Sequence, residues 1–223
     1  MLLKPPKYRP SQFRGGGEKR TCTGQYMMDD SEQMRRDPRA RRISAIEQAV
    51  VKQCIAELPA GSLVLDVPCG NGRMGRWVAQ RSDLRLVSLD YNFDMLKAMG
   101  RRDESTLLAT RARGDVLALP LAEKSVDLVI NCRLMHHIAD DETAANMYRQ
   151  IARVARGVVV TSFWSTHCWR YLRRRLLGKT VRGFPRSPAA FAEICRGAGL
   201  EVRRMVPVRK CVEEQVMVIC QSR

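Results

Sequence analysis

The chain is organised around one stretch, Leu63-Val64-Leu65-Asp66-Val67-Pro68-Cys69-Gly70-Asn71-Gly72-Arg73. Its first five residues are mostly apolar or β-branched and stop at a proline, which is typical of a short buried strand. Two glycines then allow a tight turn that leaves the backbone open to a ligand. The residues after the turn predict a helix over 73–81. A strand, a glycine turn and a helix in this order open a nucleotide-binding βαβ unit.

Strands and helices alternate along the rest of the chain. This alternation predicts an α/β fold with a Rossmann-like seven-stranded sheet, mostly parallel, and helices on both faces. Because no helix separates the last two strands, an antiparallel C-terminal strand is expected. The predicted strands span 63–67, 84–90, 107–112, 126–132, 157–163, 200–206 and 214–220. The predicted helices span 45–58, 73–81, 92–99, 142–154 and 187–199.

The composition divides the chain into a basic N-terminal segment, 1–42, and one domain, 43–223. Prolines, a triple glycine and many charges predict that the N-terminal segment is partly disordered. Residues 26–28 are expected to form a fold-back element, and Ser44 is the expected N-cap of the first helix of the domain. The N-terminus lacks the apolar run of a secretion signal, so the sequence predicts a cytoplasmic protein.

The formal charge of +16 is the most unusual global property of the chain. It favours an anionic partner, such as nucleic acid, a phosphorylated substrate or an acidic lipid surface. General enrichment of the surface in arginine is the competing explanation. The eight cysteines contain no C-x-x-C pair, so neither disulfides nor a metal site is expected.

The glycine turn alone does not select one nucleotide. The spacing Gly70-x-Gly72-x-x-Gly75, with Asp90 at the end of the second strand, also fits the dinucleotide fingerprint of NAD(P) dehydrogenases. Asp66 favours a different cofactor, because a carboxylate at this strand end would repel a pyrophosphate. It would suit the ammonium group and sulfonium centre of S-adenosylmethionine. The alternative for Asp66 is that it only caps the turn.

The chain resembles class I S-adenosylmethionine-dependent methyltransferases in four successive motifs, nearest to the small-molecule branch that includes quinone-biosynthesis methyltransferases. In the first motif Pro68 replaces the usual first glycine, as in a D-x-P-C-G-x-G subset. The motifs are the stretch 65–72, Asp90 with the residues after it, the loop 114–120, and strand 125–130 followed by 134–138. A methyltransferase (EC 2.1.1.-) that carries out O- or C-methylation of a small-molecule or lipid-like acceptor is implied.

The resemblance also implies which residues bind S-adenosylmethionine. Asp90 would bind the ribose hydroxyls, Asp115 the adenine amine, and Val116 would pack on the adenine ring, while Asp66 would hold the methionine end. The implied cofactor-binding residues are Asp66, Pro68, Cys69, Gly70, Asn71, Gly72, Asp90, Tyr91, Asp115, Val116 and Asn131.

A base would assist methylation of a hydroxyl acceptor. His136 and His137 follow the fourth strand, at the sheet edge where ligands bind, and are the candidate catalytic residues, with His167 a weaker candidate. The alternative is that they pack or line the cofactor site. The fourth strand ends in Asn131-Cys132-Arg133 without the Asn/Asp-Pro-Pro-aromatic motif of adenine and glutamine amino-methyltransferases or the Pro-Cys pair of RNA cytosine-C5 enzymes.

Residues 164–186 form a basic insertion with seven basic residues and no acidic one. Trp169, Leu172 and Leu176 have helical spacing within it. Because it follows the fifth strand, it is expected beside the mouth of the site. It could contact an anionic membrane surface, making the protein peripheral, or RNA, or be a solvated helix. An RNA methyltransferase and a non-catalytic S-adenosylmethionine- or RNA-binding module are therefore the alternative functions.

Overall fold

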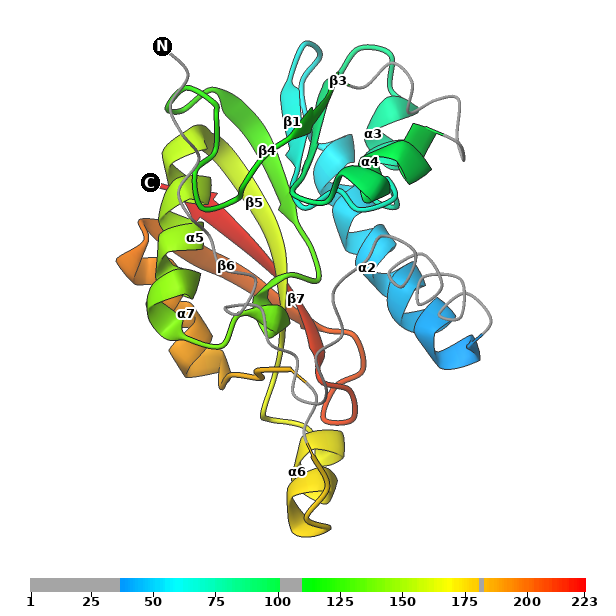
Figure 1. The fold of residues 1–223 in the computed structure, drawn as a ribbon, viewed down its shortest axis with the longest axis vertical. Coiled ribbons are helices and arrows are strands. Elements are labelled where there is room, and N and C mark those ends of the chain that lie inside the picture. The colour runs from blue at the N-terminus through cyan, green and yellow to red at the C-terminus, as the bar shows by residue number, and fades with distance from the viewer. Residues whose placement is uncertain (1–36, 101–109, 181–182) are drawn as a thin grey trace.

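The computed structural model describes residues 37–100, 110–180 and 183–223. Its elements alternate between helix and strand, as the hydrophobic pattern predicts (Figure 1). They are α2 (Pro38–Ala56), β1 (Leu63–Asp66), α3 (Gly75–Ala79), β2 (Arg85–Asp90), α4 (Phe93–Gly100), β3 (Thr110–Arg113), β4 (Val126–Asn131), the 3-10 helix η3 (Met135–His137), α5 (Asp141–Val154), β5 (Ala155–Trp164), α6 (Trp169–Leu176), α7 (Pro188–Gly197), β6 (Leu200–Pro207) and β7 (Gln215–Ser222).

One seven-stranded sheet has the strand order β3-β2-β1-β4-β5-β7-β6. The first five strands of the chain pair in parallel, and β7 pairs antiparallel with both β5 and β6. The predicted sheet, including the antiparallel C-terminal strands, is therefore confirmed. All parallel strands end at the same edge, which carries the glycine turn after β1 and η3 after β4.

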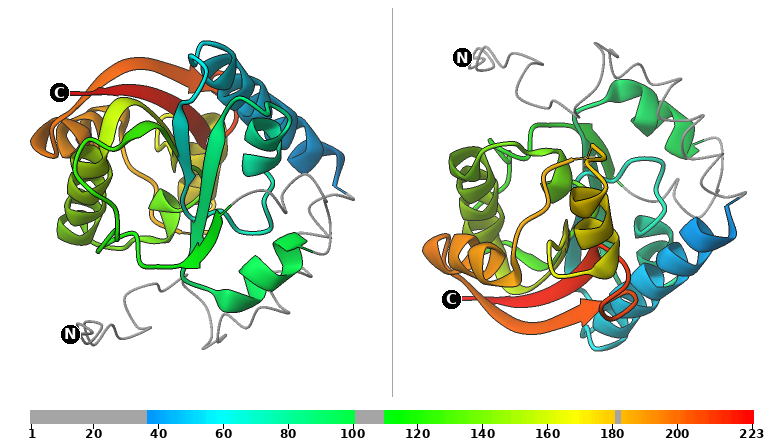
Figure 2. Two further views of the ribbon diagram at one scale, coloured as in Figure 1. Left: turned by 90° about the horizontal axis from the view of Figure 1, so that it is seen from above. Right: turned by 90° about the horizontal axis from the view of Figure 1, so that it is seen from below.

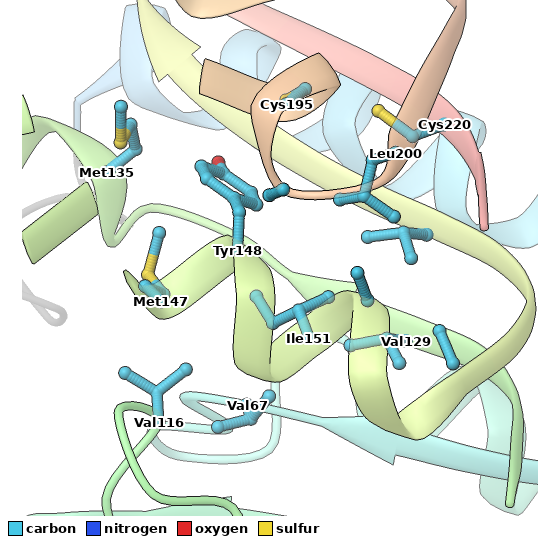
Figure 3. Packing of buried hydrophobic residues seen from close by; sticks show 14 of the residues in the cluster. Val67, Val116, Val129, Met135, Met147, Tyr148, Ile151, Cys195, Leu200 and Cys220 are labelled. Carbon is cyan, nitrogen blue, oxygen red and sulfur yellow. The ribbon is translucent and has the colours of Figure 1, made fainter. Parts of the chain in front are cut away.

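Helices cover both faces of the sheet, with α5 and α7 on one face and α2, α3 and α4 on the other (Figures 1 and 2). Figure 3 shows how Met147, Tyr148 and Ile151 of α5 point into the core that lies against Val129 of β4. A second apolar cluster packs α2, α3 and α4 on the opposite face. The central strands are buried on both sides, which explains why they read as continuous apolar runs.

The first described helix begins earlier than predicted. Ser44 is not its N-cap, because α2 starts at Pro38 and the side chain of Asp37 accepts a hydrogen bond from the Arg39 amide at 2.8 Å. An Asp-Pro pair is a good start for a helix, but the polar, arginine-rich first turn hides the apolar periodicity. Arg39 forms an ion pair with Glu213 in the β6–β7 loop, which holds this first turn on the domain.

Some predictions fall outside the described residues. These are the partial disorder of most of segment 1–42, the fold-back element at 26–28 and the first residues of the strand predicted over 107–112. Within the described part of the chain, no helix is long and apolar enough to cross a membrane.

Candidate functional site

The turn between β1 and α3 has the backbone that its glycines predict. Gly70 and Gly72 have φ angles of 55° and 80°, which side chains other than glycine rarely adopt. A Cβ on Gly72 would lie 2.9 Å from the Cγ of Met99, so the turn also packs closely against α4. Pro68, Gly70 and Asn71 are half-buried, and the Val67–Pro68 peptide bond is cis. The turn therefore presents backbone at the carboxyl edge of the sheet.

Asp66 lies at the end of β1 and is 1% exposed. One of its carboxylate oxygens accepts a hydrogen bond from the Gly75 amide at 3.0 Å, at the start of α3. Burial raises the pKa of Asp66 to about 7, although the Gly75 amide and the Arg73 charge oppose this rise. Asp66 thus makes a capping contact, which was the alternative role considered for it from the sequence. It is also a buried carboxyl whose ionised form a bound cation would stabilise.

Asp90 joins the end of β2 to the glycine turn. Its two oxygens accept hydrogen bonds from the amides of Gly70 and Asn92, each at 2.8 Å. Burial raises its pKa and these two amides lower it, with burial the larger effect. Next to it, the side chain of Tyr91 is 56% exposed, and the Arg113 guanidinium lies 5.4 Å from its ring centroid.

Asp115 and Val116 follow β3, at the same edge of the sheet. The Asp115 carboxylate accepts a hydrogen bond from the Leu117 amide at 2.9 Å, so it stabilises its own loop. Val116 is 7% exposed and belongs to the core shown in Figure 3. Both residues lie in the loop after the third strand, where the sequence placed them, and their contact with adenine stays a prediction.

Asn131 lies at the end of β4 and is fully buried. Its amide nitrogen donates to the Val67 carbonyl at 2.8 Å, and its amide oxygen accepts from the Thr161 hydroxyl at 3.0 Å. The Thr161 hydroxyl in turn lies 2.8 Å from the hydroxyl of Tyr148. This buried network holds the ends of β1, β4 and β5 together beside the turn. Cys69 is also buried, and burial raises the pKa of its thiol, which argues against a nucleophilic role.

The three histidines occupy different environments. His136 is 5% exposed and stacks on Trp164, with ring centroids 4.0 Å apart. Its Nδ1 is buried and has no hydrogen-bond partner. Burial, followed by the charges of His137 and Arg133, holds its pKa well below 6.5, so the imidazole is neutral. His137 is exposed, with its ring 4.2 Å from that of His136, and His167 is exposed in the segment after β5.

A charge cluster at this edge was missed from the sequence. Glu47 of α2 is fully buried and pairs with Arg73, directly after the turn, at 2.9 Å and with Arg133, two residues beyond the end of β4, at 2.8 Å. The two arginines share one carboxylate, so the cluster carries a net positive charge. Arg133 has a φ of 60°, an uncommon backbone for an arginine. Only the location of each arginine beside a strand end could have signalled this cluster.

Comparisons with known proteins show which protein families this sequence and this fold resemble. Residues 64–157 match the family model described as a methyltransferase domain. This part of the chain is similar to methyltransferase domains. The similarity supports S-adenosylmethionine as the cofactor. An NAD(P) dehydrogenase, which the glycine spacing also allowed, is thereby disfavoured.

Curated relatives are distant and cover about half of the chain. A tRNA (carboxymethyluridine(34)-5-O)-methyltransferase from Mus musculus is 27% identical over 106 residues, which is 48% of this chain and 15% of that protein. A probable S-adenosylmethionine-dependent methyltransferase from Mycolicibacterium smegmatis is 32% identical over 123 residues, 51% of this chain and 42% of that protein. The chain therefore spans less than half the length of these two relatives.

A solved structure shows the same fold over most of this chain. Magnesium protoporphyrin IX methyltransferase from Synechocystis PCC 6803 with bound SAH superposes with a TM-score of 0.71 at 16% identity. The match covers 89% of this chain and 97% of that one. The Rossmann-like methyltransferase fold is therefore common to both proteins.

The residues around the turn fit the cofactor in their chemistry. Asp66 is a buried carboxyl suited to a cationic group, and Asp90 lies at a strand end, where a carboxylate can accept from hydroxyls. Gly70 and Gly72 leave the backbone uncovered between them. In the described part of the chain, no group of three or more His, Cys, Asp or Glu side chains is arranged to hold a metal ion.

Proposed function

We propose that this chain transfers a methyl group from S-adenosylmethionine to a small-molecule or lipid-like acceptor. The observation that carries the proposal is the joint location of Asp66 and Asp90 at the two strand ends that meet the glycine turn. Both carboxyls are buried at the carboxyl edge of a parallel sheet, where this type of fold binds ligands. The match of residues 64–157 to a methyltransferase domain supports the same function.

Each residue has a separate task in this proposal. Asp66, in its ionised form, holds the ammonium group of the methionine end, and Asp90 accepts from the ribose hydroxyls. Asp115 accepts from the adenine amine, and Val116 packs on the ring. Asn131 acts indirectly, because its hydrogen bond to the Val67 carbonyl holds the turn. The cofactor supplies a methyl group on a sulfonium, and the chain has to align an acceptor with it and exclude water.

A groove of about 400 Å³ beside η3 is the candidate acceptor site. Its lining includes Tyr171, Arg175 and Phe184. The Phe184 amide donates to the His136 carbonyl at 2.9 Å, so the groove adjoins the buried histidine. Aromatic rings beside an arginine suit an acceptor with a flat or apolar body and a negative charge. The neutral imidazole of His136 would then accept the proton of an acceptor hydroxyl.

The second candidate acceptor is tRNA. It is favoured by the names of several curated relatives, which are tRNA methyltransferases, and by the charge of +16. The relatives match only about half of this chain, so the substrate they act on is a weaker guide than the cofactor. Basic residues after β5 would then contact phosphates.

The test is transfer of radiolabelled methyl groups into a cell extract that is afterwards separated into lipid, small-molecule, RNA and protein pools. Label in the lipid or small-molecule pool is expected, and label in the RNA pool alone would replace this acceptor by the second one. Calorimetric titration with S-adenosylmethionine is run in parallel. Binding without label in any pool would indicate a non-catalytic module, and absence of binding would refute the proposal.

A further inference from the structure

Helix α6 presents its apolar side chains to solvent. Trp169, Leu172 and Leu176 are 58%, 49% and 71% exposed, and Leu177, which follows the helix, is 55% exposed. Residues three and four apart lie on one side of a helix, so the first three side chains form a continuous apolar ridge. Four of the six large apolar side chains that are exposed in the described part of the chain lie in or next to this short helix.

The opposite side of α6 holds it on the domain through polar contacts. Arg174 lies on this side and pairs with the buried Glu214 at 3.6 Å, in the loop between β6 and β7. At the start of the helix, the Trp169 amide donates to the Cys211 carbonyl at 2.8 Å, and the Cys168 sulfur caps the helix. The helix thus turns an arginine inward and its leucines outward, the reverse of an ordinary surface helix.

Cations accompany the apolar ridge. Arg173 and Arg175 are exposed on either side of it, and Lys179 is exposed just beyond the helix. The segment 164–186 contains no acidic residue, and the whole chain carries a charge of +16. A surface that is apolar in the middle and cationic at its borders is complementary to an anionic lipid bilayer.

The location of α6 leaves the ridge free to meet a flat surface. In Figure 1 the helix projects below the body of the molecule, beyond the edge where the parallel strands end. Seen from below in Figure 2, it lies in front of that edge. The groove lined by Tyr171 and Arg175 lies along the same helix.

We propose that α6 docks the protein on an anionic lipid bilayer. The ridge of Trp169, Leu172 and Leu176 enters the boundary between headgroups and acyl chains, and Arg173 and Arg175 contact lipid phosphates. RNA is the other polyanion that basic residues could bind, but its binding surfaces combine cations with stacking aromatic rings. The exposed side chains of Leu172 and Leu176 have no aromatic ring on which an RNA base could stack. A bilayer, in contrast, accommodates all three side chains of the ridge.

Docking of α6 does not rest on methyl transfer, and it can be tested separately. For the proposed reaction it would bring a lipid-borne acceptor to the groove beside η3. Methyl transfer from S-adenosylmethionine without vesicle binding would support the proposed reaction and refute docking of α6. Vesicle binding without methyl transfer would support docking and refute the proposed reaction.

The experiment measures co-sedimentation of the full chain with vesicles of phosphatidylglycerol and phosphatidylcholine and with pure phosphatidylcholine, at physiological salt. The anionic vesicles are expected to bind at least tenfold more tightly. The variant L172Q/L176Q should lower this binding at least tenfold while its thermal midpoint stays unchanged. As a charge control, R196Q changes an exposed arginine of α7 and should leave binding within twofold.

Tryptophan fluorescence distinguishes insertion from adsorption of a basic protein. Trp169 should shift to shorter wavelength and be quenched by brominated lipid, and W169F should lack that signal against the background of the other two tryptophans. Equal vesicle binding by L172Q/L176Q and the original protein would overturn the proposal. Binding of a mixed tRNA pool that depends on Arg173 and Arg175, without vesicle binding, would overturn it in favour of RNA.

Discussion

Replacement of Asp66 by asparagine tests the cofactor site most directly. Burial raises the pKa of this carboxyl to about 7, so in the free protein it is about half ionised at neutral pH. Asparagine has nearly the same shape, and its amide oxygen can still accept the hydrogen bond from Gly75. The substitution D66N therefore removes the ionisable group and leaves the cap of α3 in place.

The size of the effect follows from the pKa. A cation bound at Asp66 would stabilise the carboxylate and return its pKa toward the ordinary value of 3.8. Affinity for S-adenosylmethionine should then be about sevenfold lower at pH 6 than at pH 7.2, which is about 1 kcal/mol. Keeping the pH below about 7.5 avoids titration of the α-amino group of the cofactor itself. The variant D66N should bind weakly and without this dependence on pH.

The stability of the cofactor-free protein should change in the opposite direction. Between pH 4 and pH 7 the folded protein retains a proton on Asp66 that the unfolded chain has released, so the free energy of unfolding falls as the pH rises through this window. D66N removes this penalty. At pH 7.5 the variant should be more stable than the original protein, by about 2 to 4 kcal/mol.

Calorimetric titration at the two pH values and urea unfolding without cofactor measure both effects. The control is D83N, which removes an exposed carboxylate that pairs with Arg81 and should leave affinity and its pH dependence unchanged. If D66N binds S-adenosylmethionine as tightly as the original protein at pH 7.2, the assignment of Asp66 to the ammonium group is wrong. A stabilised variant with unaltered affinity would leave Asp66 with its capping role alone.

Three further substitutions test the surroundings of the site. G72A should cost about 2 to 3 kcal/mol of unfolding free energy and abolish cofactor binding, because its Cβ would meet a buried methionine at 2.9 Å; G61A, with a φ of 80° and open space around it, should cost about 1 kcal/mol and spare binding. E47Q should lower the free energy of unfolding in urea by about 2 to 3 kcal/mol, since two half-buried arginines lose their shared carboxylate; an unchanged midpoint would contradict that account. H136Q should reduce kcat by about 100-fold and H137Q by less than threefold, and kcat/KM should show no ionisation of the base between pH 6.5 and 8; equal losses in the two variants would remove His136 as the base.

Much of the fold could be predicted from local patterns. The apolar runs located the strands of the sheet, and the absence of a helix between the last two strands predicted their antiparallel pairing. The start of α2 could not be predicted in this way. Its first turn is polar and arginine-rich, and it is held by the contact between Arg39 and Glu213, far apart in the sequence.

Some residues of the candidate site could likewise be located from the sequence, and others could not. Asp66 and Asp90 could be located because each lies at the end of a predicted strand, and Asp115 because it follows one, and parallel strands end at one edge. The inward orientation of Asn131 and the cluster around Glu47 could not, because their partners come from distant segments.

By itself, the sequence determined the succession of strands, turn and helices and the acidic residues at the strand ends. These depend on backbone preferences and apolar periodicity within a few neighbouring residues. Only the tertiary structure decided that the stretch around Asp66 holds a carboxyl with a pKa near 7, that His136 is neutral, and that α6 turns its leucines outward. Burial and charge at a side chain are set by groups that folding brings together from the whole chain.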